Sequence, residues 1–268
     1  MSALATRIQG PVAVIGDVHG QVDQLLAVLD QLRLLPRFEQ RWIVFIGDLV
    51  DRGPDPKSAM DVVCDLLHEH PRTTVVAGNH DYACAASIGV TPTPAYCDWG
   101  KRWLDHYDAE TTFQSYGAEF GNFQELHDHM PAEHRELLGA LPWCVEHPQY
   151  LFVHAGLDGK TPFDLQLRIL RQRDTTLNRP QWLCSKEYVR GSIPNDCPVT
   201  VVSGHVQVPR VTFGPQRILL DTTGGLGGSL SCVLLPENKV ISSGSNATPQ
   251  EHAMADHQTE NKSWWKFW

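Results

Sequence analysis

The sequence of 268 residues has no long apolar segment, no internal repeat and no excess of basic residues. A membrane-spanning helix needs about 18 consecutive apolar residues, and no run in this chain approaches that length. The formal net charge of −9 argues against a broad nucleic-acid-binding surface, so we expect no nucleic-acid partner. An anionic substrate must therefore be attracted locally, by metal ions or by a few arginines.

The cysteines also lack the number and spacing that are typical of disulfide bonds or of cysteine metal sites. There are seven, an odd number, and no two are spaced as C-x-x-C, which argues against a disulfide framework and a thiolate metal site. The first ten residues, MSALATRIQG, have no apolar core of a secretory signal peptide. We therefore expect a cytoplasmic protein whose thiols are reduced and mostly buried.

Five short apolar runs predict buried β-strands, because each is rich in Val, Ile or Phe and gives way to glycine or a polar residue. They are VAVI (12–15), WIVFI (42–46), TTVVA (73–77), LFV (151–153) and VTVVS (199–203). Residues 21–33 and 57–70 show the periodicity of amphipathic helices. Alternating strands and helices indicate an α/β fold with a largely parallel sheet, in which ligands bind beyond the carboxyl ends of the strands.

The remaining segments suggest how the chain is organised. Residues 96–148 carry aromatic and amphipathic segments and predict a helical insertion over the site. Further strands are expected after residue 206, with a tight turn at the glycine-rich 224–228. Residues 237–268 are polar and aperiodic, which is typical of a disordered tail, and leave 1–236 as one domain. The terminal SWWKFW could dock on this domain, on a partner or at a membrane interface.

The side chains at the ends of the five runs share one chemistry, since all are oxygen or imidazole ligands. They are Asp17, His19, Asp48, Asn79, His154 and His205. Carboxylate, amide and imidazole groups together suit Mn²⁺, Fe or Zn²⁺. A single histidine more often packs in a core than binds a metal, but six such positions together make chance remote. Asp48 has two carboxylate oxygens and could bridge two cations in a dinuclear centre.

The polar clusters also form an ordered set of motifs. They read GDVHG (16–20), GDLVDRG (47–53), GNHD (78–81), HAG (154–156) and GH (204–205). In this order they resemble the phosphoprotein-phosphatase family of metallophosphoesterases, and SYG (115–117) and LLDTTGGLGGSLSCV (219–233) resemble its bacterial members. The resemblance implies a sandwich of two mixed β-sheets flanked by helices, and phosphoester hydrolysis by a hydroxide bridged between two divalent metal ions.

The resemblance also assigns the metal ligands to two sets that share one residue. The first metal would be held by Asp17, His19 and Asp48. The second would be held by Asp48, Asn79, His154 and His205. The ions would therefore lie at the carboxyl ends of the strands, with Mn²⁺ expected and Fe or Zn²⁺ as alternatives.

The other motif residues would act on the substrate. By resemblance, His80 is the general acid, Asp51 accepts a hydrogen bond that orients it, and Arg52 binds phosphate oxygens with its fork of donors. The segment LRQRD (170–174) is similar to the family segment that carries a second phosphate-binding arginine. This nominates Arg173, with Arg190 as its competitor.

Two functions of other classes are compatible with parts of the sequence. Cys184 and Arg190 fit the C-x5-R pattern of cysteine-dependent phosphatases, although the loop glycines that would cradle phosphate are missing. A non-catalytic binding module that kept the fold is the second alternative. Such a module should have lost the acid His80 or a bridging ligand, and the sequence retains both.

Within the family, two substrate classes stay open. We expect a serine/threonine protein phosphatase acting on a phosphoprotein, or on a phosphorylated small molecule. The alternative is a symmetric hydrolase of dinucleoside polyphosphates such as diadenosine tetraphosphate. That group often has another residue at the position of Asp51, so the intact GDLVDRG favours the first class. Four aromatic residues of the insertion could stack on an adenine or simply pack in a helical cap: Trp99, Trp103, Tyr107 and Tyr116.

Overall fold

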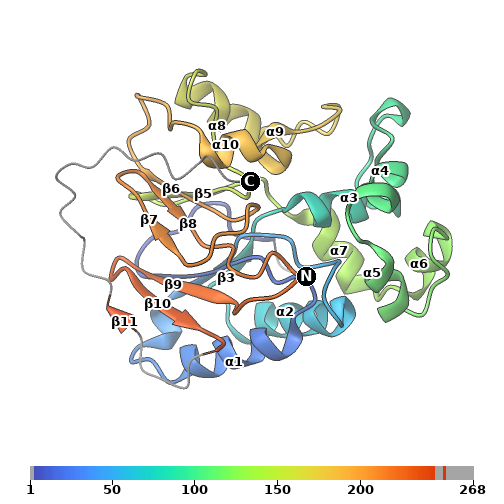
Figure 1. The fold of residues 1–268 in the computed structure, drawn as a ribbon, viewed down its shortest axis with the longest axis horizontal. Coiled ribbons are helices and arrows are strands. Elements are labelled where there is room, and N and C mark those ends of the chain that lie inside the picture. Colours follow the sequence, from blue (N-terminus) through green and yellow to red (C-terminus); the bar gives the residue numbers. More distant parts are fainter. Residues whose placement is uncertain (1–2, 245–249, 252–268) are drawn as a thin grey trace.

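Two β-sheets packed against each other form the centre of the computed structural model, which describes residues 3–244 and 250–251 (Figure 1). The six-stranded sheet has the order β11 (Gln250–Glu251), β10 (Lys239–Ser242), β9 (Ser231–Leu235), β1 (Val12–Ile15), β2 (Trp42–Phe45) and β3 (Thr73–Val75). The five-stranded sheet has the order β4 (Val145–Glu146), β5 (Tyr150–Phe152), β6 (Thr200–Ser203), β8 (Arg217–Leu219) and β7 (Thr212–Phe213).

Both sheets are mixed, as the family resemblance implies. In the first, β1, β2 and β3 run parallel, and β9 and β10 extend the sheet with antiparallel pairs. In the second, β5, β6 and β8 run parallel, and β4 and β7 are antiparallel edges. The expected α/β fold of two mixed sheets flanked by helices is therefore confirmed. The five strands predicted from apolar runs are divided between the two sheets.

The core lies on both faces of the six-stranded sheet, because successive side chains of a strand point to opposite faces. In β1, Val12 and Val14 pack toward the second sheet, in one cluster with Phe152 and Val202. The intervening Ala13 and Ile15 belong to the cluster that the helices cover. All four residues of β1 are fully buried, so an uninterrupted apolar run is what this central strand requires.

Helices cover the outer faces of both sheets. Figure 1 shows α1 (Val22–Arg33) and α2 (Pro56–Glu69) beneath the six-stranded sheet, where α1 contacts β10 and α2 contacts β3. On the side of the five-stranded sheet lie α8 (Phe163–Gln172), α9 (Gln181–Cys184) and α10 (Lys186–Arg190). Short 3₁₀ turns occur at Phe38–Gln40 and Ala95–Cys97.

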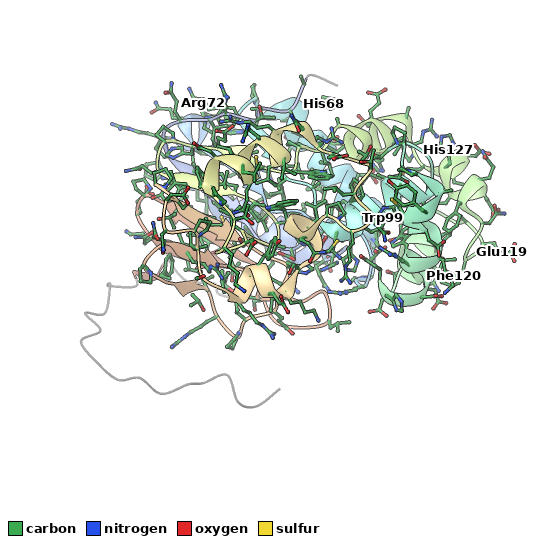
Figure 2. The ribbon with its side chains drawn as sticks, turned by 90° about the horizontal axis from the view of Figure 1, so that it is seen from above. His68, Arg72, Trp99, Glu119, Phe120 and His127 are labelled. Carbon is green, nitrogen blue, oxygen red and sulfur yellow. The ribbon has the colours of Figure 1, made fainter. Side chains whose placement is uncertain are left out.

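The predicted insertion at 96–148 carries helices from Trp99 to Ala140, and these lie beside the sheets (Figure 1). Its last residues belong to the five-stranded sheet instead, because Val145–Glu146 form the edge strand β4. Its helices are α4 (Trp99–His106), α5 (Glu110–Ser115), α6 (Phe123–His129) and α7 (Ala132–Ala140). Of these, α4 and α7 pack against α3 (Asn79–Ser87), and α5 and α7 pack against α2. Glu119 and Phe120 lie at its outer end (Figure 2). The four aromatic residues named for adenine stacking are all buried in the main core, at 0–8% exposure, so their rings offer no free face to a base: Trp99, Trp103, Tyr107 and Tyr116.

The predicted tail boundary at residue 237 needs correction. Residues 239–242 form β10, which pairs with β9, and Ile241 is buried in the main core. The strand escapes notice in the sequence because only four residues pair and the polar ones among them flank one buried isoleucine. The folded domain thus extends at least to Ser242. The aromatic SWWKFW, predicted as a docking element, lies outside the described residues.

The cysteines are all buried and unpaired, which agrees with the expectation of reduced thiols. Burial raises their pKa values; that of Cys64 reaches about 12. Buried thiols of this kind behave as small apolar side chains. Over residues 3–244 and 250–251, no helix has the length and apolar character needed to cross a membrane.

Candidate dinuclear metal centre and active site

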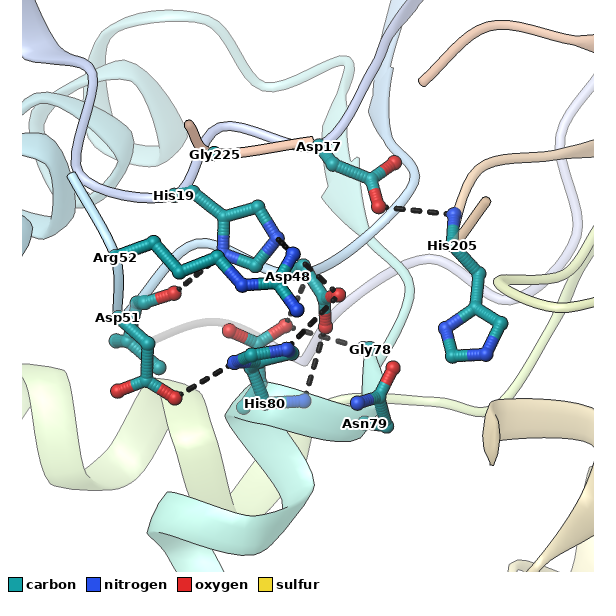
Figure 3. Close-up of polar contacts among 12 residues, drawn as sticks. Asp17, His19, Asp48, Asp51, Arg52, Gly78, Asn79, His80, His205 and Gly225 are labelled. Carbon is teal, nitrogen blue, oxygen red and sulfur yellow. Dashed lines mark hydrogen bonds and ion pairs between the residues drawn. The ribbon is translucent and has the colours of Figure 1, made fainter. Parts of the chain in front are cut away.

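The predicted ligand positions meet at one edge of the two sheets, because the parallel strands all end there (Figure 3). Asp17 and His19 follow β1, Asp48 follows β2, and Asn79 begins α3 directly after β3. From the second sheet, His154 follows β5 and His205 follows β6. Five of these six side chains are buried, and the sixth, His205, is partly exposed. The structure therefore brings together residues that are up to 188 positions apart, as Asp17 and His205 are.

The turn after β2 is strained and is held in place by a buried carboxylate. Asp48, Asp51 and Arg52 have φ angles of 53°, 70° and 66°, in the left-handed region that non-glycine residues rarely adopt. The Asp81 carboxylate accepts hydrogen bonds from the backbone N–H groups of Asp48 and Leu49, at 2.7 and 2.8 Å. Such strain persists where the surroundings fix it, and it gathers at functional sites.

Two glycines of the motifs leave room for the carboxylates. A Cβ atom at Gly78 would lie 2.0 Å from Oδ1 of Asp48, and a Cβ atom at Gly204 would lie 1.9 Å from Oδ1 of Asp17. Real side chains do not approach so closely, so any larger residue at either position would displace the carboxylate. Glycine is required at both positions because the backbone there lies directly against a carboxylate of the cluster. This explains why a glycine precedes the polar residue at these two strand ends.

The ligand atoms form two groups that share Asp48. His19, Asp48 and His80 offer atoms that all lie within 4.8 Å of one another, and so do Asp48, His154 and His205. Oδ2 of Asp48 lies 3.6 Å from Nε2 of His19 and 3.2 Å from Nε2 of His154. A carboxylate common to two groups of nitrogen and oxygen ligands is the arrangement expected of a dinuclear site.

Two of the histidines, His19 and His154, are oriented with Nε2 facing the other ligand atoms of the cluster. Nδ1 of His19 lies 2.8 Å from the carbonyl oxygen of Val50, and Nδ1 of His154 lies 2.9 Å from that of Ile46. Donation from Nδ1 to a carbonyl fixes the tautomer in which Nε2 carries a lone pair, and metal-binding histidines usually have such a partner. In both residues, Nε2 is the atom that faces Asp48.

Two buried polar atoms of the cluster have no hydrogen-bond partner within the part of the chain that the structure describes, so they are available to bind a cation. Among the described residues, Oδ1 of Asp17 and Nε2 of His205 have no hydrogen-bond partner. Oδ2 of Asp17 accepts the backbone N–H of His205 at 2.9 Å, and Oδ1 of Asn79 lies 3.0 Å from Nε2 of His154. Asp17 belongs to neither group above, but its unpartnered oxygen is suited to a cation. The residues therefore fit two divalent ions.

The imidazoles differ in charge for physical reasons. Burial lowers the pKa of His19 to about 3, and the neighbouring His80 adds to this. Burial likewise lowers the pKa of His205 to about 3. Burial also opposes the charged form of His154, but the Asp48 carboxylate outweighs it and raises the pKa of His154 to about 10. Two imidazoles are thus ready to bind a metal, and a cation would replace the proton on His154.

The pKa shifts of two carboxyl groups indicate that the cluster holds more negative charge than the protein alone compensates. Burial, together with Asp221, raises the pKa of the Asp17 carboxyl well above its usual range. Burial would also raise the pKa of Asp48, but the charges of His154 and His80 hold it well below its ordinary value. Divalent cations would neutralise these crowded acids, so metal binding and folding stability should be coupled.

We expect Mn²⁺ to stabilise the folded protein measurably. At a metal concentration about 100-fold above the dissociation constant, binding adds about 2.7 kcal/mol to the free energy of unfolding, which raises the thermal midpoint of this domain by about 5–10 °C. Scanning calorimetry of protein treated with chelator, with and without Mn²⁺, measures the shift. The surface variant Asp30→Asn should retain it. An equal midpoint in both conditions would contradict a metal site.

Asp51 and His80 form a buried pair beside the metal-ligand groups (Figure 3). Nδ1 of His80 lies 2.7 Å from Oδ2 of Asp51, and Nε2 of His80 lies 4.0 Å from Oδ2 of Asp48. The carboxylate thus orients the ring so that Nε2 faces the site. Burial raises the pKa of Asp51 to about 7, although the hydrogen bonds from Thr112 and Trp103 oppose the rise.

Arg52 lies at the mouth of the site with its guanidinium group partly exposed. Its Nη1 donates to the carbonyl oxygen of Gly224 at 2.9 Å and lies 3.2 Å from Nε2 of His19. Its Nε lies 3.9 Å from a carboxylate oxygen of Asp108. A Cβ atom at Gly225 would lie 2.7 Å from Cδ of Arg52, so the glycine-rich turn packs directly on this side chain. The turn is therefore one wall of the site.

The contacts of the two arginines named as a second phosphate ligand are with other parts of the protein or with solvent. Arg173 donates to the carbonyl oxygens of Gly139 and Ala140, at 2.9 and 3.3 Å, and so caps the end of α7. Arg190 ends α10 and is exposed. A role for Arg173 in phosphate binding stays a prediction. A third arginine, Arg179, is close enough to the site for its charge to act on Tyr107. Burial raises the pKa of this tyrosine, and the charge of Arg179 opposes that rise.

The cysteine-dependent alternative finds little support in the geometry. Cys184 is buried, and burial raises the pKa of its thiol to about 11. The nucleophile of such enzymes is a thiolate with a lowered pKa, exposed at a phosphate-binding loop. The C-x5-R spacing here spans α9 and α10 instead of a phosphate-binding loop.

Three residues contact the site in ways that the sequence does not predict; of these, only Trp103 is singled out by the sequence, as a candidate for adenine stacking. Asp81 stands in the GNHD motif, and its position three residues after the helix-capping Gly78 is a signal for a capping role. Trp103 and Thr112 contact Asp51 from the helical insertion. They lie 52 and 61 positions from it, so the sequence contains no local signal for these contacts.

Comparisons with known proteins agree with this geometry. A sequence model of the family of calcineurin-like phosphoesterases matches residues 10–238. A symmetrical bis(5'-nucleosyl)-tetraphosphatase of Photobacterium profundum is 26% identical over 184 residues, which cover 68% of this chain and 58% of the relative. The corresponding protein of Yersinia enterocolitica is 43% identical over 68 residues, which cover 25% and 22% of the two chains. The chain therefore spans a fifth to somewhat over half of the length of these relatives.

Solved structures share the fold over most of the chain. A crystal structure of a candidate diadenosine tetraphosphatase has a TM-score of 0.59 and 23% identity, covering 92% of this chain and 98% of the other. A protein serine/threonine phosphatase of Saccharomyces cerevisiae has a TM-score of 0.58 and 15% identity, covering 92% and 81%. A cold-active protein tyrosine phosphatase has a TM-score of 0.57 and 16% identity, covering 90% and 78%. Likenesses at these identities show the fold alone.

Proposed function

Because the chain belongs to the calcineurin-like phosphoesterase family, we propose that it hydrolyses phosphate esters with the help of two divalent metal ions. The support is the pair of ligand groups that share Asp48. Divalent cations held there would generate a nucleophile from water at neutral pH and offset the charge of the phosphate. We propose Mn²⁺ as the metal, with Fe or Zn²⁺ as alternatives, because the ligands are oxygen and imidazole nitrogen atoms.

The ligands proposed for the two ions follow the motifs and the positions of the side chains. Asp17, His19 and Asp48 would hold one ion, and Asp48, Asn79, His154 and His205 would hold the other. Arg52 would bind phosphate oxygens, since its guanidinium group is anchored through Nη1 at the edge of the cluster and is partly exposed. Asp108 lies against the same guanidinium group, so an incoming phosphate would compete with this carboxylate.

The substrate we propose is a phosphoserine or phosphothreonine protein. The observation that carries this proposal is the buried contact between His80 and Asp51, at 2.7 Å. It holds the His80 imidazole in a fixed orientation beside the site. Burial lowers the pKa of this imidazole to about 3, so the ring would take up its proton in the complex with the substrate phosphate, whose negative charge favours the protonated form. An alkoxide leaving group needs such a donor because it is a strong base. A nucleotide released from a polyphosphate is a much weaker base and gains less from a general acid.

The surface next to the site is consistent with a peptide. A hollow of about 580 Å³ adjoins the glycine-rich turn and is lined by Gln207, Val208, Pro209, Thr222 and Leu226–Gly228. Leu226 is 78% exposed at the tip of this turn. The lining is neutral and contains no aromatic ring, so it offers an adenine no stacking partner but could accept an aliphatic side chain beside a phosphorylated residue.

Symmetric cleavage of dinucleoside tetraphosphates is the second candidate function. It is supported by the names of the relatives in Photobacterium profundum and Yersinia enterocolitica. The buried insertion aromatics would then take no part in base binding. We also propose that the protein acts in the cytoplasm, because its seven unpaired, buried thiols suit a reducing compartment.

The deciding experiment compares both substrates with protein stripped by chelator and reloaded with Mn²⁺. We expect a higher kcat/KM for a phosphoserine peptide than for diadenosine tetraphosphate. Faster conversion of the dinucleotide to two molecules of ADP would make the second candidate the function. Absence of metal-dependent turnover of either substrate would overturn the proposed hydrolase activity.

A further inference from the structure

One segment of the helical insertion, residues 103–112, reaches the candidate active site. It begins within α4, contains the connection to α5 and ends in the first turns of α5. Its side chains and backbone contact Asp51, Arg52 and His80, the three residues proposed to act on the substrate. The insertion is therefore in contact with the catalytic turn itself, besides packing against α3.

The contacts with Asp51 are the most specific of these. Nε1 of Trp103 donates to Oδ2 of Asp51 at 2.7 Å, the same oxygen that lies 2.7 Å from Nδ1 of His80. The Thr112 hydroxyl donates to Oδ1 at 2.6 Å and accepts the backbone N–H of Asp51 at 3.0 Å. Asp51, Trp103 and Thr112 are all fully buried, so water cannot replace either donor.

Two neighbouring residues of the segment strengthen the connection. The ring of Tyr107 packs edge-on against the ring of His80, with centroids 4.7 Å apart and an angle of 67°. The carbonyl oxygen of Asp108 accepts the backbone N–H of Arg52 at 3.2 Å. The segment thus contacts the orienting carboxylate, the imidazole that it orients and the backbone of the phosphate-binding arginine.

We infer that Trp103 and Thr112 are positioning residues, which hold the Asp51 carboxylate in the orientation from which it fixes the ring of His80. The inference rests on the proposed function, in which His80 is the general acid. Thr112 on Oδ1 and Trp103 on Oδ2 together fix the plane of the carboxylate independently of His80. Without either of them, the carboxylate could turn about its Cβ–Cγ bond together with the ring of His80. Small displacements of an acid–base group cost much of its effect, because proton transfer requires close alignment.

Trp103→Phe and Thr112→Val test the inference, since each removes one donor. Thr112→Val keeps the shape of the side chain, whereas Trp103→Phe also leaves a smaller ring, a change that its control reproduces. We expect kcat for the phosphoserine peptide to fall by about 10- to 100-fold in each, the usual cost of losing an outer partner of a functional side chain, with KM nearly unchanged. Hydrolysis of an aryl phosphate should change little, because a weakly basic leaving group needs no proton donor. Thr112→Ser should restore the activity.

The chain offers a matched control for each variant. Trp143 is fully buried but its Nε1 has no hydrogen-bond partner in the described structure, and the same is true of Oγ1 of Thr111. Trp143→Phe and Thr111→Val therefore alter size or polarity without removing such a bond. Equal losses of kcat for the alkyl and aryl esters, or equal losses in the controls, would overturn a positioning role.

A second measurement does not depend on turnover. In protein labelled with ¹⁵N-histidine, the Nδ1–H resonance of His80, assigned by its loss in His80→Asn, reports on the hydrogen bond to Asp51. We expect this resonance to shift or disappear in Trp103→Phe and Thr112→Val and to stay in the two controls. An unchanged resonance in both test variants would overturn the inference. Failure of the wild-type protein to hydrolyse any ester would instead refute the proposed function. The resonance of His80 would then still decide whether Trp103 and Thr112 position Asp51.

Discussion

Replacing His80 by asparagine is expected to lower kcat for a phosphoserine peptide by about 100- to 10,000-fold, the range that positioned acid–base groups contribute. The physical reason is the leaving group: a serine alkoxide must be protonated as the bond to phosphorus breaks. His80 is suited to this, since Asp51 accepts from its Nδ1 and its Nε2 faces Asp48. With an aryl phosphate the loss should be far smaller. Steady-state kinetics of both esters with saturating Mn²⁺ provide the comparison.

The metal content of the same variant separates two roles for His80. Its ligand atom lies in one group with those of His19 and Asp48, so a metal-ligand role is the competing interpretation. As a general acid, His80 can be lost without loss of metal, and His80→Asn should keep two ions per chain by elemental analysis. Retention of only one ion would show that His80 is a ligand. The control is His70→Asn, which makes the same change at a buried histidine that contacts Thr73.

Replacing Asp48 by asparagine is expected to reduce kcat/KM by about 1000-fold or more, whichever ester is used, because two-metal charge stabilisation is worth several kcal/mol. Asp48 is the one residue common to both ligand groups, and its Oδ2 approaches ring nitrogens of His19 and His154. The amide of asparagine has the same shape as the carboxylate but no negative charge, so it cannot offset the positive charge of two metal ions. Measurement of kcat/KM for alkyl and aryl phosphates at several Mn²⁺ concentrations tests this.

The loss in Asp48→Asn should be accompanied by loss of metal. We expect fewer than two ions per chain and a much smaller rise of the thermal midpoint on addition of Mn²⁺ than in the wild-type protein. Unlike His80→Asn, this variant should lose activity toward alkyl and aryl esters alike. Asp30→Asn, which makes the same change on the surface, is the control. Full activity together with two bound ions would contradict the bridging role.

The strands and the positions of the polar motifs could be predicted because their signals are local. The apolar run 12–15 coincides with β1, and 42–46, 151–153 and 199–203 each match a strand to within one residue at either end. Burial on both faces requires continuous apolar residues, and close approach of backbone to carboxylates requires the glycines at the strand ends. Both requirements leave a visible pattern in sequence.

Other features could not be predicted because they depend on what a side chain meets after folding. The insertion aromatics could equally have faced a ligand, and only packing shows that residues such as Trp99 are buried. Arg173 lies in a segment similar to one that binds phosphate, yet it donates to carbonyl oxygens of α7. Strand β10 lies in the segment predicted to be a tail, since one buried Ile241 in a polar segment gives no clear periodicity.

The family, the two-sheet fold and the set of polar residues at the strand ends follow from the amino-acid sequence, because strands, turns and motif spacing are properties of short segments. How those residues combine follows from the packing alone: ligand atoms form two groups around Asp48, and Trp103 and Thr112 donate hydrogen bonds to Asp51 from the insertion. The difference arises from distance along the chain. Hydrogen bonds between residues 52 or 61 positions apart depend on how whole helices pack against the sheets, and no local pattern of amino acids encodes them.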